Sequence, residues 1–223
     1  MTGARVSTAA ALVSTHHNYD RLFSIYVPIG LGILAFIALG MPVVALIFRR
    51  RPPERAARWH EQHMLEGTYA VLLVAVVAFL LWKTFGVEHQ VDTVANQEKG
   101  GVTIKVVASR WEWSFYYPRY HITVRSGWTG DQAFVVPVNQ PIHFYLTSVD
   151  VIHSFWIPAL DYKHDNFPGA TQEVTLTFTN PGTFPGQCAE FCGFGHSEMV
   201  FDARAVSSAR FAAWAASGGR APA

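Results

Sequence analysis

Cysteine is scarce in this sequence, since Cys188 and Cys192 are the only two among its 223 residues. One pair cannot form the disulfide framework that stabilises many small secreted domains. The sequence also lacks a Cys-x2-Cys-His run, which excludes a covalently attached c-type haem. Because only three residues separate the two cysteines, a shared site is the first role to consider for them.

An excess of charge of either sign is also missing. The chain has 17 lysines and arginines against 16 aspartates and glutamates, for a formal net charge of +1. No basic patch is interleaved with aromatic residues, which argues against nucleic-acid binding. Two long apolar runs lie within the first 90 residues, and the polar, aromatic-rich remainder is long enough for one domain of ordinary size.

The two apolar runs predict two membrane-spanning helices. Leu22–Phe48 carries no charged residue and exceeds the roughly 20 residues that a helix needs to cross a bilayer. Its two prolines are tolerable, because neighbouring helices can satisfy the freed backbone groups in a membrane. Gly67–Trp82 is the second run, and Trp82 with Lys83 is typical of an interfacial anchor, so the helix is expected to reach about Val87. The alternative is a helix buried in a large soluble protein, but nothing else here is large enough to bury one.

Arginines are concentrated between the two runs and predict the orientation. The segment contains five arginines and three glutamates: Arg49, Arg50, Arg51, Arg55 and Arg58 against Glu54, Glu61 and Glu66. By the positive-inside rule this loop is cytoplasmic. Both termini and everything after residue 88 are then extracytoplasmic, in a cell-membrane protein with two spans.

Short β-branched segments with Gly, Pro, Asn and Asp between them follow, and they predict a sandwich or barrel. The expected strands are Val102–Ala108, His121–Arg125, Ala133–Val138, Ile142–Thr147 and Val174–Thr179. Ser207–Ser217 is expected to form a closing helix, capped by Ser207 or Ser208. The predicted fold class is therefore mixed, an N-terminal two-helix transmembrane hairpin followed by an all-β domain. The expected divisions are an extracytoplasmic segment 1–21, the hairpin 22–88, a linker 89–101, the β domain 102–217 and a tail 218–223.

The segment QCAEFCGFGHSEM, residues 187–199, concentrates soft metal ligands. It contains Cys188, Cys192, His196 and Met199, and His153 lies upstream in VDVIHSFWIP. Thiolate and thioether are soft ligands and imidazole suits copper, so this is a copper-binding set.

The second cysteine distinguishes between kinds of copper site. A mononuclear blue-copper site uses two histidines, one cysteine and a weak axial methionine, which leaves one cysteine over. Two thiolates can instead bridge two copper ions and spread one unpaired electron over both, which suits electron transfer. A Cys2His2 zinc site and a Cys188–Cys192 disulfide are the alternatives that the residues leave open.

The segments VDVIHSFWIPAL, FPG and PGQCAEFCGFGHSEM resemble the CuA signature of cytochrome c oxidase subunit II, the copper-bearing subunit of haem–copper oxygen reductases. The resemblance covers nearly the whole chain and implies that the β domain is cupredoxin-like, with a Greek-key topology. It further implies that Cys188 and Cys192 bridge two coppers and that His153 and His196 are terminal ligands. The weak ligands would be Met199 and the backbone carbonyl of Glu190.

The same resemblance assigns roles outside the copper ligands. The side chain of Glu190 would meet a magnesium ion at the border with the catalytic subunit, although a solvated loop carboxylate is the alternative. In RWEWSFYY, residues 110–117, Trp111 would receive the electron from the donor, whereas Trp113 is expected to fill the core. The family often has Gln and Tyr on either side of this tryptophan, where Arg110 and Glu112 stand here, so the donor surface is expected to differ.

Charge and membrane position suggest two further roles. The region 102–206 holds three more acidic than basic residues, which mildly favours a basic donor, and Asp150 matches a donor-facing position of the family. Glu66 resembles a glutamate at the cytoplasmic mouth of a proton channel, with a merely interfacial carboxylate as the alternative. Tyr69 and Leu73 stand where the family often has Trp and Pro, which weakens that alignment.

The implied function is electron transfer from cytochrome c, or from a small blue-copper protein, to haem in subunit I. Oxygen is reduced there at haem and CuB, coupled to proton translocation, and the chain itself breaks no substrate bond. Other oxidase subunits and membrane lipid are the remaining expected partners. A membrane-anchored copper chaperone is the main rival. A nitrous oxide reductase, which is soluble and carries a large propeller domain, does not fit the hairpin.

Overall fold

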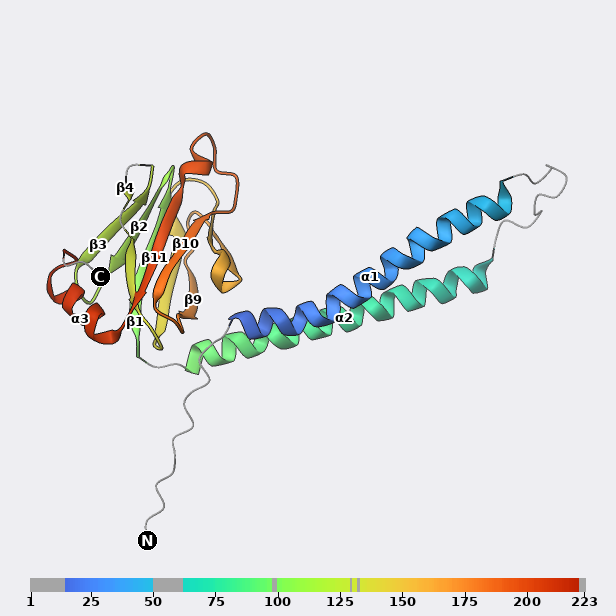
Figure 1. The fold of residues 1–223 in the computed structure, drawn as a ribbon, viewed down its shortest axis with the longest axis horizontal. Coiled ribbons are helices and arrows are strands. Elements are labelled where there is room, and N and C mark those ends of the chain that lie inside the picture. The colour runs from blue at the N-terminus through green and yellow to red at the C-terminus, as the bar shows by residue number, and fades with distance from the viewer. Residues whose placement is uncertain (1–14, 50–61, 98–99, 129, 132, 221–223) are drawn as a thin grey trace, which may run out of the picture. The chain divides into compact units, whose positions relative to one another are not determined.

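The computed structural model describes residues 15–49, 62–97, 100–128, 130–131 and 133–220. Contacts within the chain define two units, a helical unit over His17–Gln90 and a β unit that includes Val91–Ala223. Figure 1 shows the helical unit in blue to green and the β unit in green to red. Each unit is described by itself.

The helical unit consists of α1, Thr15–Phe48, and α2, His63–Gln97. Both helices are long and apolar enough to cross a membrane, as the sequence predicts. The hydroxyl of Tyr26 donates a hydrogen bond to the carbonyl of Leu80 at 3.2 Å and lies 2.5 Å from the hydroxyl of Thr84. This polar contact joins the two helices within an otherwise apolar pair, where few competing hydrogen-bond partners are present.

Both helices extend beyond the predicted bounds. α1 begins seven residues before Leu22, at Thr15, and α2 continues to Gln97, so most of the segment expected to be a linker at 89–101 is helical. An apolar run marks the part of a helix that fits in lipid, whereas the backbone ladder can continue into water through polar residues. Of the five arginines in the segment between the helices, only Arg49 lies within the described residues, so the orientation signal remains a prediction from sequence.

The β unit is a sandwich of two sheets (Figure 1). The six-stranded sheet has the order β4-β3-β2-β1-β6-β9, with β1 Val102–Ser109, β2 Glu112–Tyr117, β3 Ile122–Gly127, β4 Gly130–Asp131, β6 Pro141–Ser148 and β9 Gln172–Thr177. The five-stranded sheet has the order β5-β11-β10-β7-β8, with β5 Phe134–Pro137, β7 His153–Ile157, β8 Tyr162–Asn166, β10 Gly182–Cys188 and β11 Val200–Val206. The pairs β1–β6 and β5–β11 are parallel, and the others are antiparallel.

The core between the sheets is aromatic. The strand β2 alternates half-buried and buried residues, and Trp113, Phe115 and Tyr117 point inward with no exposed surface. Phe155 of β7 and Phe201 of β11 stack with ring centroids 4.9 Å apart, and Trp113 meets Phe201 edge-on at 5.4 Å. Buried ring pairs of this kind stabilise a fold by more than the burial of their apolar area alone. They hold β7 and β11 of the five-stranded sheet against β2 of the six-stranded sheet.

The closing helix α3 covers Ser208–Ala216, one residue shorter at each end than predicted. Ser207 caps it, because its side chain accepts a hydrogen bond from the backbone N–H of Arg210 at 3.4 Å. Phe211 and Trp214 bury their rings against the sandwich. Two short 3-10 turns, Pro158–Leu160 and His196–Glu198, complete the described elements of the β unit, and the second belongs to the loop with the soft ligands.

Candidate metal centre

Strand pairing brings the first histidine to the first cysteine. β7 and β10 are antiparallel neighbours in which Cys188 pairs with Phe155. Because side chains alternate along a strand, His153 lies on the same face as Phe155, diagonally across from Cys188. His153 is fully buried and Cys188 is almost so. Two residues 35 positions apart in sequence therefore meet at one end of the five-stranded sheet.

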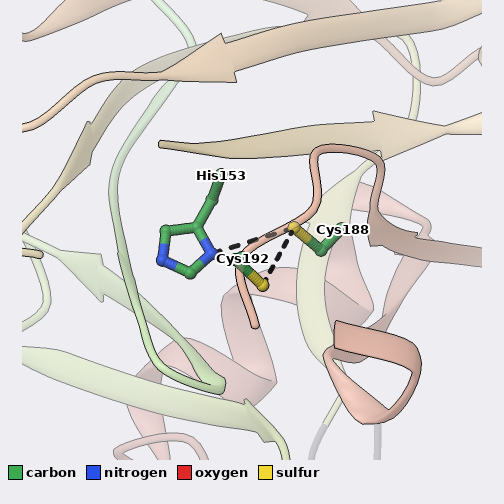
Figure 2. Close-up of side chains that lie close together, drawn as sticks. All are labelled: His153, Cys188 and Cys192. Carbon is green, nitrogen blue, oxygen red and sulfur yellow. Dashed lines mark hydrogen bonds between the residues drawn. The ribbon is translucent and has the colours of Figure 1, made fainter. Parts of the chain in front are cut away.

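The ligand atoms form two matching groups around the two sulfurs. The Sγ of Cys188 lies 3.8 Å from His153 Nδ1 and 3.3 Å from the carbonyl oxygen of Glu190. The Sγ of Cys192 lies 3.6 Å from His196 Nδ1 and 3.9 Å from Met199 Sδ. Each group thus offers one imidazole and one weaker ligand, an oxygen in the first and a thioether in the second. Figure 2 shows Cys188 in contact with both His153 and Cys192.

These spacings fit shared metal ions. Metal–sulfur bonds of about 2.3 Å and metal–nitrogen bonds of about 2.0 Å at a tetrahedral ion place two ligand atoms about 3.5–3.8 Å apart. The two cysteine sulfurs are 3.9 Å apart and unbonded, and the ligand atoms of His153, Cys188 and Cys192 all lie within 4.8 Å of one another. Soft sulfur with imidazole is the donor set that copper prefers, so the residues present fit a copper site.

Backbone hydrogen bonds close the loop that carries the ligands. The N–H of Cys188 donates to the carbonyl of Met199 at 2.9 Å, which joins the first and last residues of the loop. The buried indole of Trp113 donates to the same carbonyl at 3.2 Å, and the N–H of Ala189 donates to Ser154 at 3.0 Å. The loop is therefore anchored to β2 and β7 by hydrogen bonds that do not involve the ligand side chains.

The electrostatics of the two thiols differ. Burial works to raise the pKa of Cys188, but hydrogen bonds with His153 and with the backbone of Ser154 and Glu190 lower it to about 7. Burial, together with the neighbouring Cys188 sulfur, raises the pKa of Cys192 to about 12. A bound cation offsets such repulsion between two thiolates. The second thiol is thus the one that most needs a metal in order to lose its proton.

Asp150 orients the first histidine. Its Oδ1 accepts a hydrogen bond from His153 Nε2 at 2.9 Å, so that Nδ1 is the ring nitrogen that faces Cys188. Its Oδ2 accepts from the backbone N–H and the Nε of Arg110 at 2.8 and 3.3 Å. A carboxylate behind a metal-binding imidazole fixes the ring and its tautomer. From sequence Asp150 is predicted only as a donor-facing acid, although it precedes His153 by just three residues; its contact with Arg110 joins positions 40 residues apart.

The remaining candidate residues lie in three different places. Trp111 is half-buried and packs on the glycines of the ligand loop, as described below, whereas Trp113 is in the core as expected. The carboxylate of Glu190 is exposed, although its carbonyl faces Cys188. Glu66 lies in the first turn of α2, half-exposed and 3.9 Å from His63, in the helical unit. Its role at the mouth of a proton channel stays a prediction.

Known proteins similar to this chain all point to one family. Residues 125–206 match the family described as "Cytochrome C oxidase subunit II, periplasmic domain". The cytochrome c oxidase subunit 2 of Alkalihalophilus pseudofirmus is 33% identical over 201 residues, which are 88% of this chain and 57% of that protein. A probable cytochrome c oxidase subunit 2 of Rickettsia prowazekii is 28% identical over 203 residues, 84% of this chain and 64% of that protein. The chain thus spans less than two thirds of the length of these two relatives.

A solved structure agrees with the sequence matches. The periplasmic domain of subunit II of cytochrome oxidase from Bradyrhizobium japonicum aligns with a TM-score of 0.51 and 35% sequence identity. The alignment covers 54% of this chain and 94% of that domain. The β sandwich described above is therefore the cupredoxin-like fold of that domain, as the sequence predicts.

Proposed function

The chain belongs to the cytochrome c oxidase subunit II family, and we propose that it is the electron-accepting subunit of a haem–copper oxygen reductase. In this proposal it takes single electrons from a soluble donor at a dinuclear copper centre and delivers them to haem in subunit I. Oxygen is reduced to water there, at haem and CuB, with coupled proton translocation. The observation that carries the proposal is the pair of unbonded sulfurs, each next to one imidazole and one weaker ligand.

The ligand roles follow from the two matching groups. Cys188 and Cys192 would bridge the metals, and His153 and His196 would each bind one of them. Met199 and the carbonyl of Glu190 would be the weak ligands. The two coppers, when bound, supply a one-electron redox couple shared between both ions. The protein holds the ligands in place through the closed loop and excludes water, because His153, Cys188, Cys192 and Met199 are all buried.

The surroundings of the ligands suit electron transfer better than bond-making chemistry. No open coordination position is needed, since every ligand of the proposed pair comes from the chain. A rigid site that changes little on reduction keeps the reorganisation of the protein small. Asp150 and the core ring of Trp113, which meets the His153 ring edge-on at 6.3 Å, both limit movement of the first imidazole.

Membrane position and partners complete the proposal. The helices are proposed to span the cell membrane, with the β domain and both termini on the extracytoplasmic side. On the extracytoplasmic side, the proposed electron donor is cytochrome c or a small blue-copper protein. Other oxidase subunits surround the hairpin in lipid, and Glu66 admits protons at the cytoplasmic mouth of a channel. The exposed carboxylate of Glu190 is proposed to share a magnesium ion with subunit I.

A redox titration of the copper-loaded chain in detergent tests the function. Two coppers per chain and one electron taken up per two coppers are expected, with reduction by ferrocytochrome c. One copper per chain that exchanges rapidly with a chelator, without electron uptake from cytochrome c, would instead identify a copper chaperone. Zinc in the purified chain, with no copper uptake, would exclude both copper functions.

A further inference from the structure

Three aromatic rings cluster at the surface beside the ligand loop. Trp111, Trp128 and Phe194 come from three separate segments, and their ring centroids are 5.6 Å, 6.4 Å and 6.1 Å apart in pairs. The side chains of Trp128 and Phe194 are 51% and 87% exposed, respectively. Exposed rings in mutual contact form a preorganised apolar patch rather than isolated surface hydrophobes. We call these three residues the three-ring surface.

The two tryptophans are similarly close to Gly195 of the ligand loop. A Cβ placed on Gly195 would lie 2.5 Å from the Trp111 ring and 2.6 Å from the Trp128 ring. Only glycine permits so close an approach of two indoles to the backbone. Gly195 directly precedes His196, so Trp128 touches the same loop, at the same point, as the tryptophan expected to receive the electron.

The hairpin that carries Trp128 is fastened to Trp111. The backbone N–H of Trp128 donates to the carbonyl of Trp111 at 3.0 Å. Gly127 has φ 120°, and a Cβ there would lie 2.6 Å from the same carbonyl. The indole of Trp128 is therefore held in place by the fold at its backbone.

The charges on either side of Trp111 are already paired within the chain. Arg110 contacts Asp150 at 3.3 Å, and Glu112 contacts Arg125 at 3.4 Å. Each pair sums to zero, so these four side chains add no net charge next to Trp111. The acidic excess counted over the whole domain, which favours a basic donor, includes Asp150 and Glu112, although both contact arginines.

We propose that the three-ring surface docks a soluble one-electron donor whose exposed redox-centre edge is apolar, with Trp128 as a second positioning residue beside Trp111. The inference rests on the proposed function and names the chemistry of its donor. Aromatic anchors in contact with one another are the residues that most often dominate binding energy at an interface. A donor seated on these rings would lie against the loop that holds Cys192 and His196, where electron transfer needs it. Because complementary charge mainly raises association rates, docking without it should depend little on salt.

Stopped-flow reduction of the full-length, copper-loaded chain in lipid nanodiscs tests the proposal. The probes are a lysine-rich c-type cytochrome and a small c-type cytochrome of near-zero net charge. With the near-neutral probe, Trp128→Ala should lower the second-order rate constant about 10- to 30-fold, the scale of a binding hot spot, with the copper absorption spectrum unchanged. Trp128→Phe should restore most of the rate. Binding of the same cytochrome to the copper-free chain should weaken in parallel, a readout that needs no electron transfer.

Two control variants separate the alternatives. Tyr145→Ala removes another partly exposed ring, on β6, which forms none of the described ring contacts with Trp111, and should leave the rate unchanged. Glu112→Gln removes charge next to Trp111 and should change the rate less than about twofold, with a correspondingly weak salt dependence. A rate for Trp128→Ala within twofold of the wild type would overturn the inference. So would a steep fall of the wild-type rate with salt, matched by an equal loss in Glu112→Gln.

The same experiment distinguishes the inference from the function on which it rests. If the wild-type chain binds copper and accepts electrons normally while Trp128→Ala has no effect, only the docking inference fails. If the wild-type chain accepts electrons from neither cytochrome, the proposed function and the inference fail together. Crosslinking from position 128 to a second copy of the chain, in place of the cytochrome, would also overturn the inference.

Discussion

Replacing Asp150 by asparagine should weaken both the fold and the copper site. All four nitrogen groups that contact this carboxylate are donors. Oδ1 accepts from His153 Nε2 and the Val151 N–H, and Oδ2 accepts from the N–H and Nε of Arg110. An asparagine presents an NH2 group to one of these two pairs whichever way it is turned, so two hydrogen bonds are lost. At about 1.5–3 kcal/mol for each bond to a charged group, reduced for partial exposure, we expect a loss of about 2–4 kcal/mol.

The pH dependence of this stability loss provides a second, independent test. Burial alone would raise the pKa of Asp150, but hydrogen bonds from His153, Val151 and Arg110 hold it well below its usual range. A depressed carboxyl pKa stabilises the fold above the unfolded-state value of about 3.9, and that stabilisation is lost as the pH falls further. The difference in stability between wild type and Asp150→Asn should therefore be full near neutral pH and shrink below about pH 4.

Denaturant unfolding of the reduced, copper-free chain in detergent measures this difference, followed by near-ultraviolet circular dichroism. Asp202→Asn, at an exposed position of β11, is the matched control and should change stability by less than about 0.5 kcal/mol. Copper affinity of Asp150→Asn should also fall about 10- to 100-fold, because His153 loses its orienting partner. Equal stability of the variant and the wild type at pH 7, or a gap that persists undiminished at pH 3, would refute the reasoning.

Three further substitutions test other parts of the account. Tyr117→Phe leaves the buried N–H and C=O of Val135 without the hydroxyl that both contact, at 2.9 and 2.7 Å, and should cost about 2–4 kcal/mol in denaturant unfolding; a loss under about 1 kcal/mol would show that the pair finds other partners. Trp111→Phe should slow reduction by cytochrome c about tenfold or more in stopped flow, equivalent to ~1.4 kcal/mol, with the copper spectrum intact, and an unchanged rate would remove its electron-accepting role. Glu66→Gln should slow proton-coupled reduction of the partner's oxygen site in the assembled oxidase without altering the copper spectrum, and normal turnover would reject the channel role.

The sequence predicted the two long apolar helices and singled out side chains that the structure brings together, because both depend on local patterns. Uncharged length alone identifies a span. Cys188, Cys192 and Met199 lie within twelve residues, so their closeness in space follows from one short loop. His153 is predicted as a ligand because it is an imidazole in the segment VDVIHSFWIP. The register of β7 against β10 explains why it reaches the two cysteines.

Strands were predicted less completely than helices. The residues after Trp111 alternate between half-buried and buried positions along β2. The sequence therefore contains a strand pattern there, which the predicted strands do not include. β7 has almost every residue buried, and β10 carries glycine and proline, so neither shows the alternation that marks a half-exposed strand. Such strands are defined by their neighbours in the sheet and not by their own pattern.

Tertiary contacts between loops were beyond prediction from sequence. Asp150 meets Arg110 only after two segments 40 residues apart have come together, and Trp128 reaches Trp111 through a hairpin. The sequence showed that Arg110 and Glu112 depart from the family's usual residues. It could not show that each is neutralised by a partner within the chain, at Asp150 and Arg125.

Electron paramagnetic resonance of the oxidised, copper-loaded chain tests the central claim most directly. One unpaired electron shared equally by two copper nuclei of spin three-halves gives a seven-line hyperfine pattern, and Cys188→Ser should abolish it. A four-line pattern from a single copper, or a seven-line pattern that survives Cys188→Ser, would contradict a centre in which the two sulfurs jointly hold two metal ions.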